Sequence, residues 1–125
     1  MFCVDSCEWI EYFSKGPLAD KYAAWIAKAK PSSCLVPAIV FFEVYKKIKR
    51  EQGQDAAEYA VAAMLSCSTP VELDDGTAVL AADFALSKKL GLADAIILAT
   101  ISQRNALLIT SDKHFKGMSG IEFIE

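Results

Sequence analysis

Short apolar runs alternate with longer helical segments along the chain, and this alternation constrains the fold more than any other feature. Residues 106–111, ALLITS, are mostly apolar and partly β-branched, as in a strand that is covered on both faces. Strands that alternate with helices predict a three-layer α/β/α domain with a mainly parallel central sheet of four to five short strands. We expect strands at residues 2–5, 34–37, 71–73, 106–111 and 121–125, and helices at residues 8–16, 18–30, 38–53, 54–67, 76–91 and 92–105.

The size and composition of the chain predict one domain, spanning residues 1–125, with a substantial core, because 54% of its 125 residues are hydrophobic. The 16 Asp and Glu residues outnumber the 13 Lys and Arg residues, which gives a net charge of −3. A general nucleic-acid binder depends on bulk positive charge, so the composition argues against that class. An enzyme that holds nucleic acid locally is still compatible with this charge.

Cysteine usage and hydropathy argue against two further classes. The four cysteines form no C-x-x-C pair and the chain has one histidine, so we expect free thiols in apolar surroundings and no zinc site. No apolar run approaches the roughly 20 residues of a membrane span, and the N-terminus lacks the pattern of a signal peptide. We therefore expect a cytoplasmic protein without a membrane partner.

Four acidic residues occupy positions where a parallel sheet places a ligand site. Asp5 ends the first expected strand and Asp112 ends the fourth, while Asp94 opens the helix that leads into the fourth strand. Glu43 lies in residues 38–45, a helical segment that is otherwise apolar. Ligands of parallel sheets bind beyond the carboxyl ends of the strands, so these acids are candidates for one common site.

Each acid also has an ordinary structural interpretation. Asp5 can cap a helix, Asp112 can form an Asx turn, and acids such as Asp94 are favourable in a first helical turn. Glu43 fits these explanations least, because a buried glutamate without a partner costs several kcal/mol or becomes protonated. Acids that crowd together repel one another unless a cation neutralises them, and Mg²⁺ or Mn²⁺ prefers such oxygen ligands. This combination suits metal-assisted hydrolysis of a phosphodiester.

The segments FCVDS, PAIVFFEV and LGLADAIILAT, followed by LLITSDKHF, resemble PIN-domain ribonucleases of the VapC-like toxin type, which act in type II toxin–antitoxin systems. The resemblance covers essentially the whole chain. It implies a PIN-like fold and a toxin that is an endoribonuclease dependent on Mg²⁺ or Mn²⁺. It also implies that the toxin forms a homodimer and binds a cognate antitoxin. The acids that it implies as catalytic residues and metal ligands are Asp5, Glu43, Asp94 and Asp112.

Two further groups of residues are candidates around these acids. Hydroxyl groups that orient carboxylates or waters are expected at Ser6, Thr110 and Ser111, although each can also be an ordinary turn residue. RNA phosphate contacts are expected from Lys46, Lys47, Lys113, His114 and Lys116. A solvated helix face and a polar loop explain the same basic residues without RNA.

Other functions compete with a toxin. A PIN-type nuclease that processes RNA without an antitoxin would share the same residues, and so would a PIN-like domain that only binds. A receiver-like phosphoacceptor domain, which serves signalling, has a similar size and α/β pattern. That domain needs adjacent acids after its first strand and a lysine at the end of its last strand, whereas this chain has VDS at the first place. It would also leave Glu43 and Asp94 unexplained.

Overall fold

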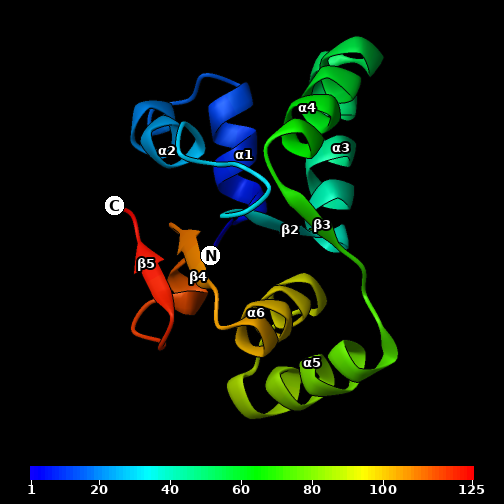
Figure 1. Cartoon of the computed structure of the whole chain (residues 1–125), viewed down its shortest axis with the longest axis vertical. Coiled ribbons are helices and arrows are strands. Elements are labelled where there is room, and N and C mark those ends of the chain that lie inside the picture. The colour runs from blue at the N-terminus through cyan, green and yellow to red at the C-terminus, as the bar shows by residue number, and fades with distance from the viewer.

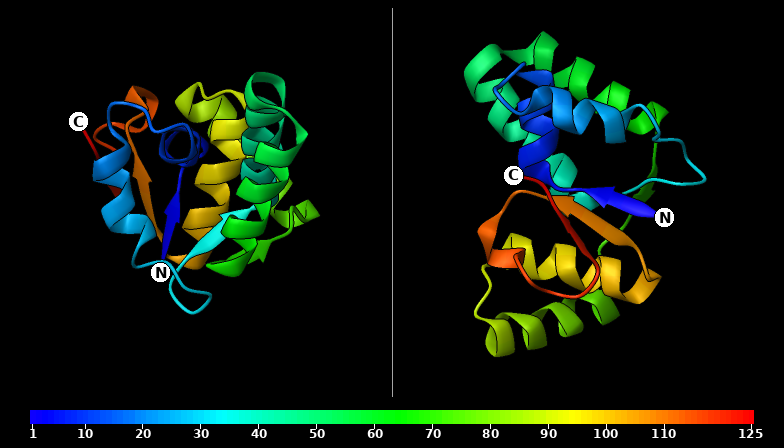
Figure 2. Two further views of the ribbon diagram at one scale, coloured as in Figure 1. Left: turned by 90° about the horizontal axis from the view of Figure 1, so that it is seen from above. Right: turned by 90° about the vertical axis from the view of Figure 1, so that its left-hand side faces the viewer.

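The computed structural model describes residues 1–125 and has three layers, in which strands lie between two layers of helices (Figure 1, Figure 2). Helices α1 to α4 cover one face, and α5 and α6 cover the other. The three-layer α/β/α prediction is confirmed. In chain order the elements are β1 (Phe2–Val4), α1 (Ser6–Phe13), α2 (Ala19–Ile26), β2 (Leu35–Pro37), α3 (Ala38–Gln52), α4 (Gln54–Ser66), β3 (Thr69–Val71), α5 (Asp75–Lys88), α6 (Leu92–Arg104), β4 (Leu107–Thr110), the 3₁₀ turn η1 (Lys113–Phe115) and β5 (Ile121–Phe123).

All strand pairs are parallel, and their order determines where a site can form. One ladder has the order β1-β4-β5 and the other pairs β2 with β3, while an isolated parallel bridge between Phe2 and Cys34 joins the two. The resulting order is β3-β2-β1-β4-β5. The chain first builds outward from β1 to β3 and then continues on the other side of β1 with β4. The order therefore reverses between β1 and β4, where open parallel sheets bind ligands.

Local sequence signals account for most element boundaries. Helix α1 begins at Ser6 rather than at the expected residue 8, because the Asp5 side chain caps it. Helix α3 follows Pro37 directly and ends at Gly53, whose φ of 96° favours glycine. Strand β3 covers Thr69–Val71 and lies two residues before the expected 71–73. The strand includes Pro70, which is tolerated there because β3 is an edge strand.

The core lies between the strands and both helix layers. Its larger cluster has 21 buried residues, among them Val4, Val36 and Ile109 from three strands. The cysteines are free thiols, as expected, but Cys7 is exposed, so the expectation of apolar surroundings was wrong for it. None of the helices has the length and apolar character that crossing a membrane requires.

Replacing Ile97 by alanine should destabilise the fold by about 2–5 kcal/mol, because the side chain is fully buried in α6 and its removal leaves a cavity. Urea unfolding of Ile97→Ala beside Val79→Ala, an exposed position on α5, measures the difference. Equal midpoints for the two variants would contradict this description of the core.

Candidate active site

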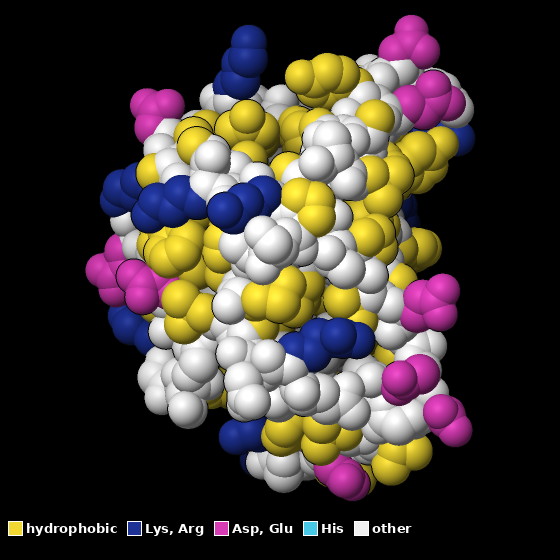
Figure 3. All heavy atoms as spheres, viewed as in Figure 1, with side chains coloured by type: hydrophobic (Ala, Val, Ile, Leu, Met, Phe, Trp, Pro, Cys, Tyr) yellow, Lys and Arg dark blue, Asp and Glu magenta, His cyan; other side chains and the backbone are white.

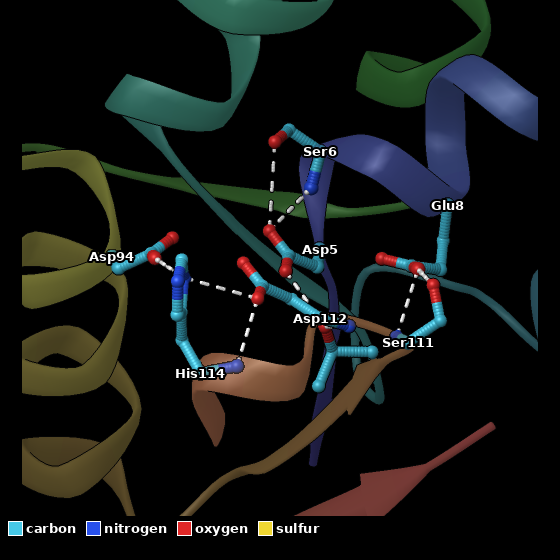
Figure 4. Close-up of polar contacts among 8 residues, drawn as sticks. Asp5, Ser6, Glu8, Asp94, Ser111, Asp112 and His114 are labelled. Atoms are coloured by element: carbon cyan, nitrogen blue, oxygen red, sulfur yellow. Dashed lines mark hydrogen bonds and ion pairs between the residues drawn. The ribbon is translucent and has the colours of Figure 1, made fainter. Parts of the chain in front are cut away.

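Three of the four acids meet at the carboxyl ends of β1 and β4. Asp5 follows β1, Asp112 follows β4, and Asp94 lies in the first turn of α6. Figure 4 shows these side chains and that of His114 directed toward one another from α6, from the start of α1 and from the turn after β4. The structure thus brings together residues that are separated by up to 109 positions in the sequence.

Asp5 is only 2% exposed and is hydrogen-bonded on both of its oxygens. Its Oδ1 accepts the backbone N–H of Ser6 at 2.7 Å, and its Oδ2 accepts the hydroxyl of Thr110 at 2.8 Å. The Thr110 oxygen in turn accepts the N–H of Asp112 at 3.0 Å. These bonds connect the end of β1 to the end of β4. Asp5 caps α1 and also faces the cluster, so the two interpretations of this residue are compatible.

His114 lies between two of the carboxylates. Its Nδ1 is 3.2 Å from Oδ2 of Asp94 and 3.1 Å from Oδ1 of Asp112. The same Asp112 oxygen accepts the backbone N–H of His114 at 2.9 Å, which is the expected turn. The charge of Asp112, together with Asp94, raises the pKa of His114 above its usual range. The ring therefore partly balances the two acids, a contact that sequence analysis did not anticipate.

Glu43 completes the set from α3. Its side chain is half-buried, and burial raises its pKa, while a hydrogen bond from Ser6 lowers it and the charge of Asp94 raises it further. Ser6 also lies 3.5 Å from Asp5 through its hydroxyl oxygen. Ser6 and Thr110 therefore contact the acids at positions where sequence analysis expected orienting hydroxyls. All four acids are near enough for their charges to interact.

The cluster is electrostatically strained when it holds no cation. Burial, followed by the charge of Glu8, raises the pKa of Asp5 to about 7. Burial, followed by the charge of Asp112, raises the pKa of Asp94. No Lys or Arg forms a salt bridge with any of the four acids. Ionised carboxylates in such a place are unfavourable until positive charge arrives.

Glu8 is a fifth acid near the site, and sequence analysis missed it. It lies on α1 and is 0% exposed. Its Oε1 accepts both the N–H and the hydroxyl of Ser111, at 2.9 Å and 2.5 Å. Ser111 thus contacts Glu8 instead of the four predicted acids. In the sequence, Glu8 has the appearance of a favourable first-turn acid. Only its position three residues after Asp5, the N-cap of α1, could have indicated it.

The predicted RNA-contacting residues fall in two places. Lys113 and Lys116 lie near the C-terminus, where Lys116 pairs with Glu125 at 3.1 Å. Lys46 and Lys47 line a groove of about 310 Å³ between α1 and α3 that begins beside the acids. The residues that line this groove are Ser6, Cys7, Ile10, Glu43, Lys46, Lys47 and Arg50.

The donor set fits a hard divalent cation. Oxygen and nitrogen ligand atoms of Asp94, Asp112 and His114 lie within 4.8 Å of one another. Asp5 and Glu43 adjoin them, and burial raises the pKa of both carboxyl groups, so added positive charge would favour their ionised forms. Carboxylate oxygens are the ligands that Mg²⁺ and Mn²⁺ prefer.

The fold and the site together define a class of small α/β/α domains, in which acidic side chains converge where the order of the parallel strands reverses. Within this class, residues 2–121 match the family model of the PIN domain. The chain belongs to the PIN domain family, as its sequence motifs had indicated. The comparison with curated proteins gives no match.

Solved structures with this fold confirm the resemblance to VapC-like proteins at the level of the fold. VapC20 of Mycobacterium tuberculosis, described as a sarcin–ricin loop cleaving toxin, superposes with a TM-score of 0.83 at 17% identity over 100% of both chains. A toxin–antitoxin complex from Klebsiella pneumoniae gives 0.79 at 24% identity, over 98% of this chain and 96% of the other. VapBC2 of Rickettsia felis, bound to a DNA fragment from its promoter, gives 0.78 at 16% identity, over 99% and 98%.

The metal-free protein should lose stability as pH rises from about 4 to about 7. Asp5 has a folded pKa of about 7 against a usual 3.8, so its ionisation costs folding free energy within this window and the decrease is complete above it. Asp5→Asn removes this penalty and should be more stable than the wild type at pH 8 by a few kcal/mol, at roughly 1.4 kcal/mol per unit of pKa.

Urea unfolding in EDTA at several pH values measures this difference. Asp83→Asn, an exposed position on α5, makes the same charge change away from the cluster and should follow the wild type. If the stability of Asp5→Asn depended on pH as that of the wild type does, ionisation of Asp5 would not destabilise the fold.

Proposed function

We propose that residues 1–125 act as a single PIN-like domain, a metal-dependent endoribonuclease that hydrolyses RNA phosphodiesters. The observation that carries this proposal is the convergence of Asp5, Asp94 and Asp112, with Glu43 beside them, at the switch point of a PIN fold. Buried acids of this kind reduce the stability of the metal-free fold, so a function is a better explanation for them than packing.

The residues that would hold the cation are Asp5, Glu43, Asp94 and Asp112. His114 contacts Asp94 and Asp112. A bound Mg²⁺ or Mn²⁺ supplies charge neutralisation and polarises a phosphoryl oxygen. The chain's own part is positioning. Thr110 holds Asp5 and the backbone of Asp112 in one arrangement, through bonds of 2.8 Å and 3.0 Å. Carboxylates held in this way need little rearrangement when the cation and the phosphate bind.

The groove between α1 and α3 gives the RNA strand a place to lie. It contains Glu43 at one end, and Lys46, Lys47 and Arg50 follow along α3. Arg50 is seven residues from Glu43, which is about 10.5 Å along a helix. A phosphate at the acids would therefore have neighbouring phosphates beside the basic residues. Figure 3 shows that other basic side chains also gather in a row at the upper left of one face, but the groove is the better candidate because it includes Glu43.

The likeness to VapC proteins extends the proposal to a biological role. Two of the similar structures are toxin–antitoxin or VapBC assemblies, and VapC20 is described as a sarcin–ricin loop cleaving toxin. We therefore propose a cytoplasmic toxin that forms a homodimer and is inhibited by a cognate antitoxin. A processing nuclease would have the same site without that partner. Membership of the PIN family leaves the receiver-like alternative without support.

Asp94→Asn should abolish metal-dependent RNA cleavage, by at least about 100-fold, because it removes a charge that faces the proposed cation. A mixed pool of structured RNAs with Mg²⁺ or Mn²⁺, and with EDTA as a blank, measures cleavage. Asp83→Asn is the matched control and should cleave at the wild-type rate. Wild-type cleavage by Asp94→Asn, or cleavage that persists in EDTA, would rule out the proposed metal site.

Lys46→Ala combined with Lys47→Ala should weaken RNA binding and flatten its salt dependence, by about 0.7 in the log–log slope for each phosphate that the lysines no longer neutralise. Binding is measured on the Asp94→Asn background, so that RNA stays intact. Lys28→Ala combined with Lys30→Ala is the control, since both lysines are exposed and lie outside the groove. Equal slopes for the two double variants would remove the groove from the proposal.

A further inference from the structure

The buried carboxylate of Glu8 has no role in the proposed chemistry, yet it contacts the site. It accepts two hydrogen bonds from Ser111, one from the backbone and one from the hydroxyl. Its second oxygen, Oε2, is also buried, and the buried hydroxyl of Tyr22 lies near enough to lower the pKa of Glu8, against the larger effect of burial, which raises it. No Lys or Arg pairs with Glu8. A buried carboxylate that has no cationic partner reduces the stability of the fold, so packing alone does not explain Glu8.

The position of Ser111 shows what the contact does. Ser111 directly precedes Asp112 and lies three residues before His114, in the turn that leaves β4. Glu8 lies on α1, which directly follows Asp5. The Glu8–Ser111 contact therefore joins the same two segments as the Asp5–Thr110 bond. Figure 4 shows Glu8 and Asp5 on opposite sides of this turn. Two separate links hold a short irregular segment better than one.

We propose that Glu8 is a positioning residue, which fixes the turn after β4 so that Asp112 and His114 face Asp5 and Asp94. Glu8 does not touch the cation or the RNA itself. The inference rests on the proposed function, because the benefit of a fixed turn is a preformed cation site. Partners that orient metal ligands typically change metal affinity or activity by about 10- to 100-fold when they are removed.

Two substitutions separate positioning from the effect of charge. Glu8→Ala removes both the acceptor and the charge. Glu8→Gln removes the charge and replaces one oxygen by an NH2 group, but it keeps an oxygen that can accept the two Ser111 bonds. Positioning predicts that Glu8→Ala weakens Mn²⁺ binding by about tenfold or more, and that Glu8→Gln restores most of it. Calorimetric titration with Mn²⁺ alone measures the affinity, and kcat/KM for RNA cleavage should follow the same order.

Glu11→Ala is the matched control on the same helix. Glu11 accepts the N–H of Leu18 at 2.9 Å, a contact at the far end of α1, so its removal should leave Mn²⁺ affinity unchanged. If Glu8→Ala fails to fold, Ser111→Ala replaces it, because it deletes the hydroxyl bond and keeps the backbone bond. That variant should show a smaller decrease of affinity in the same direction.

Hydrogen exchange of residues 111–115 in EDTA tests the turn independently of metal binding. Their amides should exchange faster in Glu8→Ala than in Glu11→Ala and should be near wild type in Glu8→Gln. The proposal would be overturned if Glu8→Ala changed neither the exchange rates nor the Mn²⁺ affinity. If Glu8→Gln were as impaired as Glu8→Ala, the charge of Glu8 and not its hydrogen bonds would explain the effect. A wild-type protein that binds no Mn²⁺ would refute the proposed function instead, and the exchange rates would still report on the turn.

Discussion

The parallel pairing of β1 with β4 is the constraint on which the site depends. This pairing places Val4 opposite Ile109 and lets the Asp5 N–H donate to the Ile109 carbonyl at 3.0 Å. With that register, the residues just beyond the two strands emerge side by side, and the Thr110 hydroxyl reaches Asp5. A slip of one residue would turn Thr110 to the other face and separate Asp5 from Asp112. The sheet thus sets the spacing of the acids before any cation is involved.

Stability and function oppose each other around this pairing. The apolar strands and the helices on both faces make the fold stable, and they also bury Asp5 and Glu8, whose ionised forms are then unfavourable. Hydrogen bonds from Ser6, Thr110 and Ser111 offset part of this cost. The remaining strain favours any ligand that brings positive charge to the cluster. A bound cation would reduce the excess negative charge of the cluster, and the basic residues of the groove beside Glu43 would reduce it further.

Sequence reasoning predicted much of this site because the acids follow regular elements. Asp5 and Asp112 end apolar strands, and Glu43 interrupts an apolar helix, so each departs from a local pattern. Glu8 gave no such signal, since an acid in a first helical turn is ordinary. The role of Ser111 as its partner depends on a contact across 103 positions. RNA contact was one expectation for His114, and its approach to Asp94 appears only when α6 and η1 meet.

The sequence by itself determined the alternation of strands and helices, their approximate bounds and the acids at their ends. These features follow from hydrophobic periodicity, capping and turn residues, all of which act over a few positions. Only the tertiary structure decided the strand order β3-β2-β1-β4-β5, the exposure of Cys7 and the contact of Glu8 with Ser111. Those depend on which strands pair and on how helices pack over them, and such long-range contacts leave no periodic trace in a single sequence.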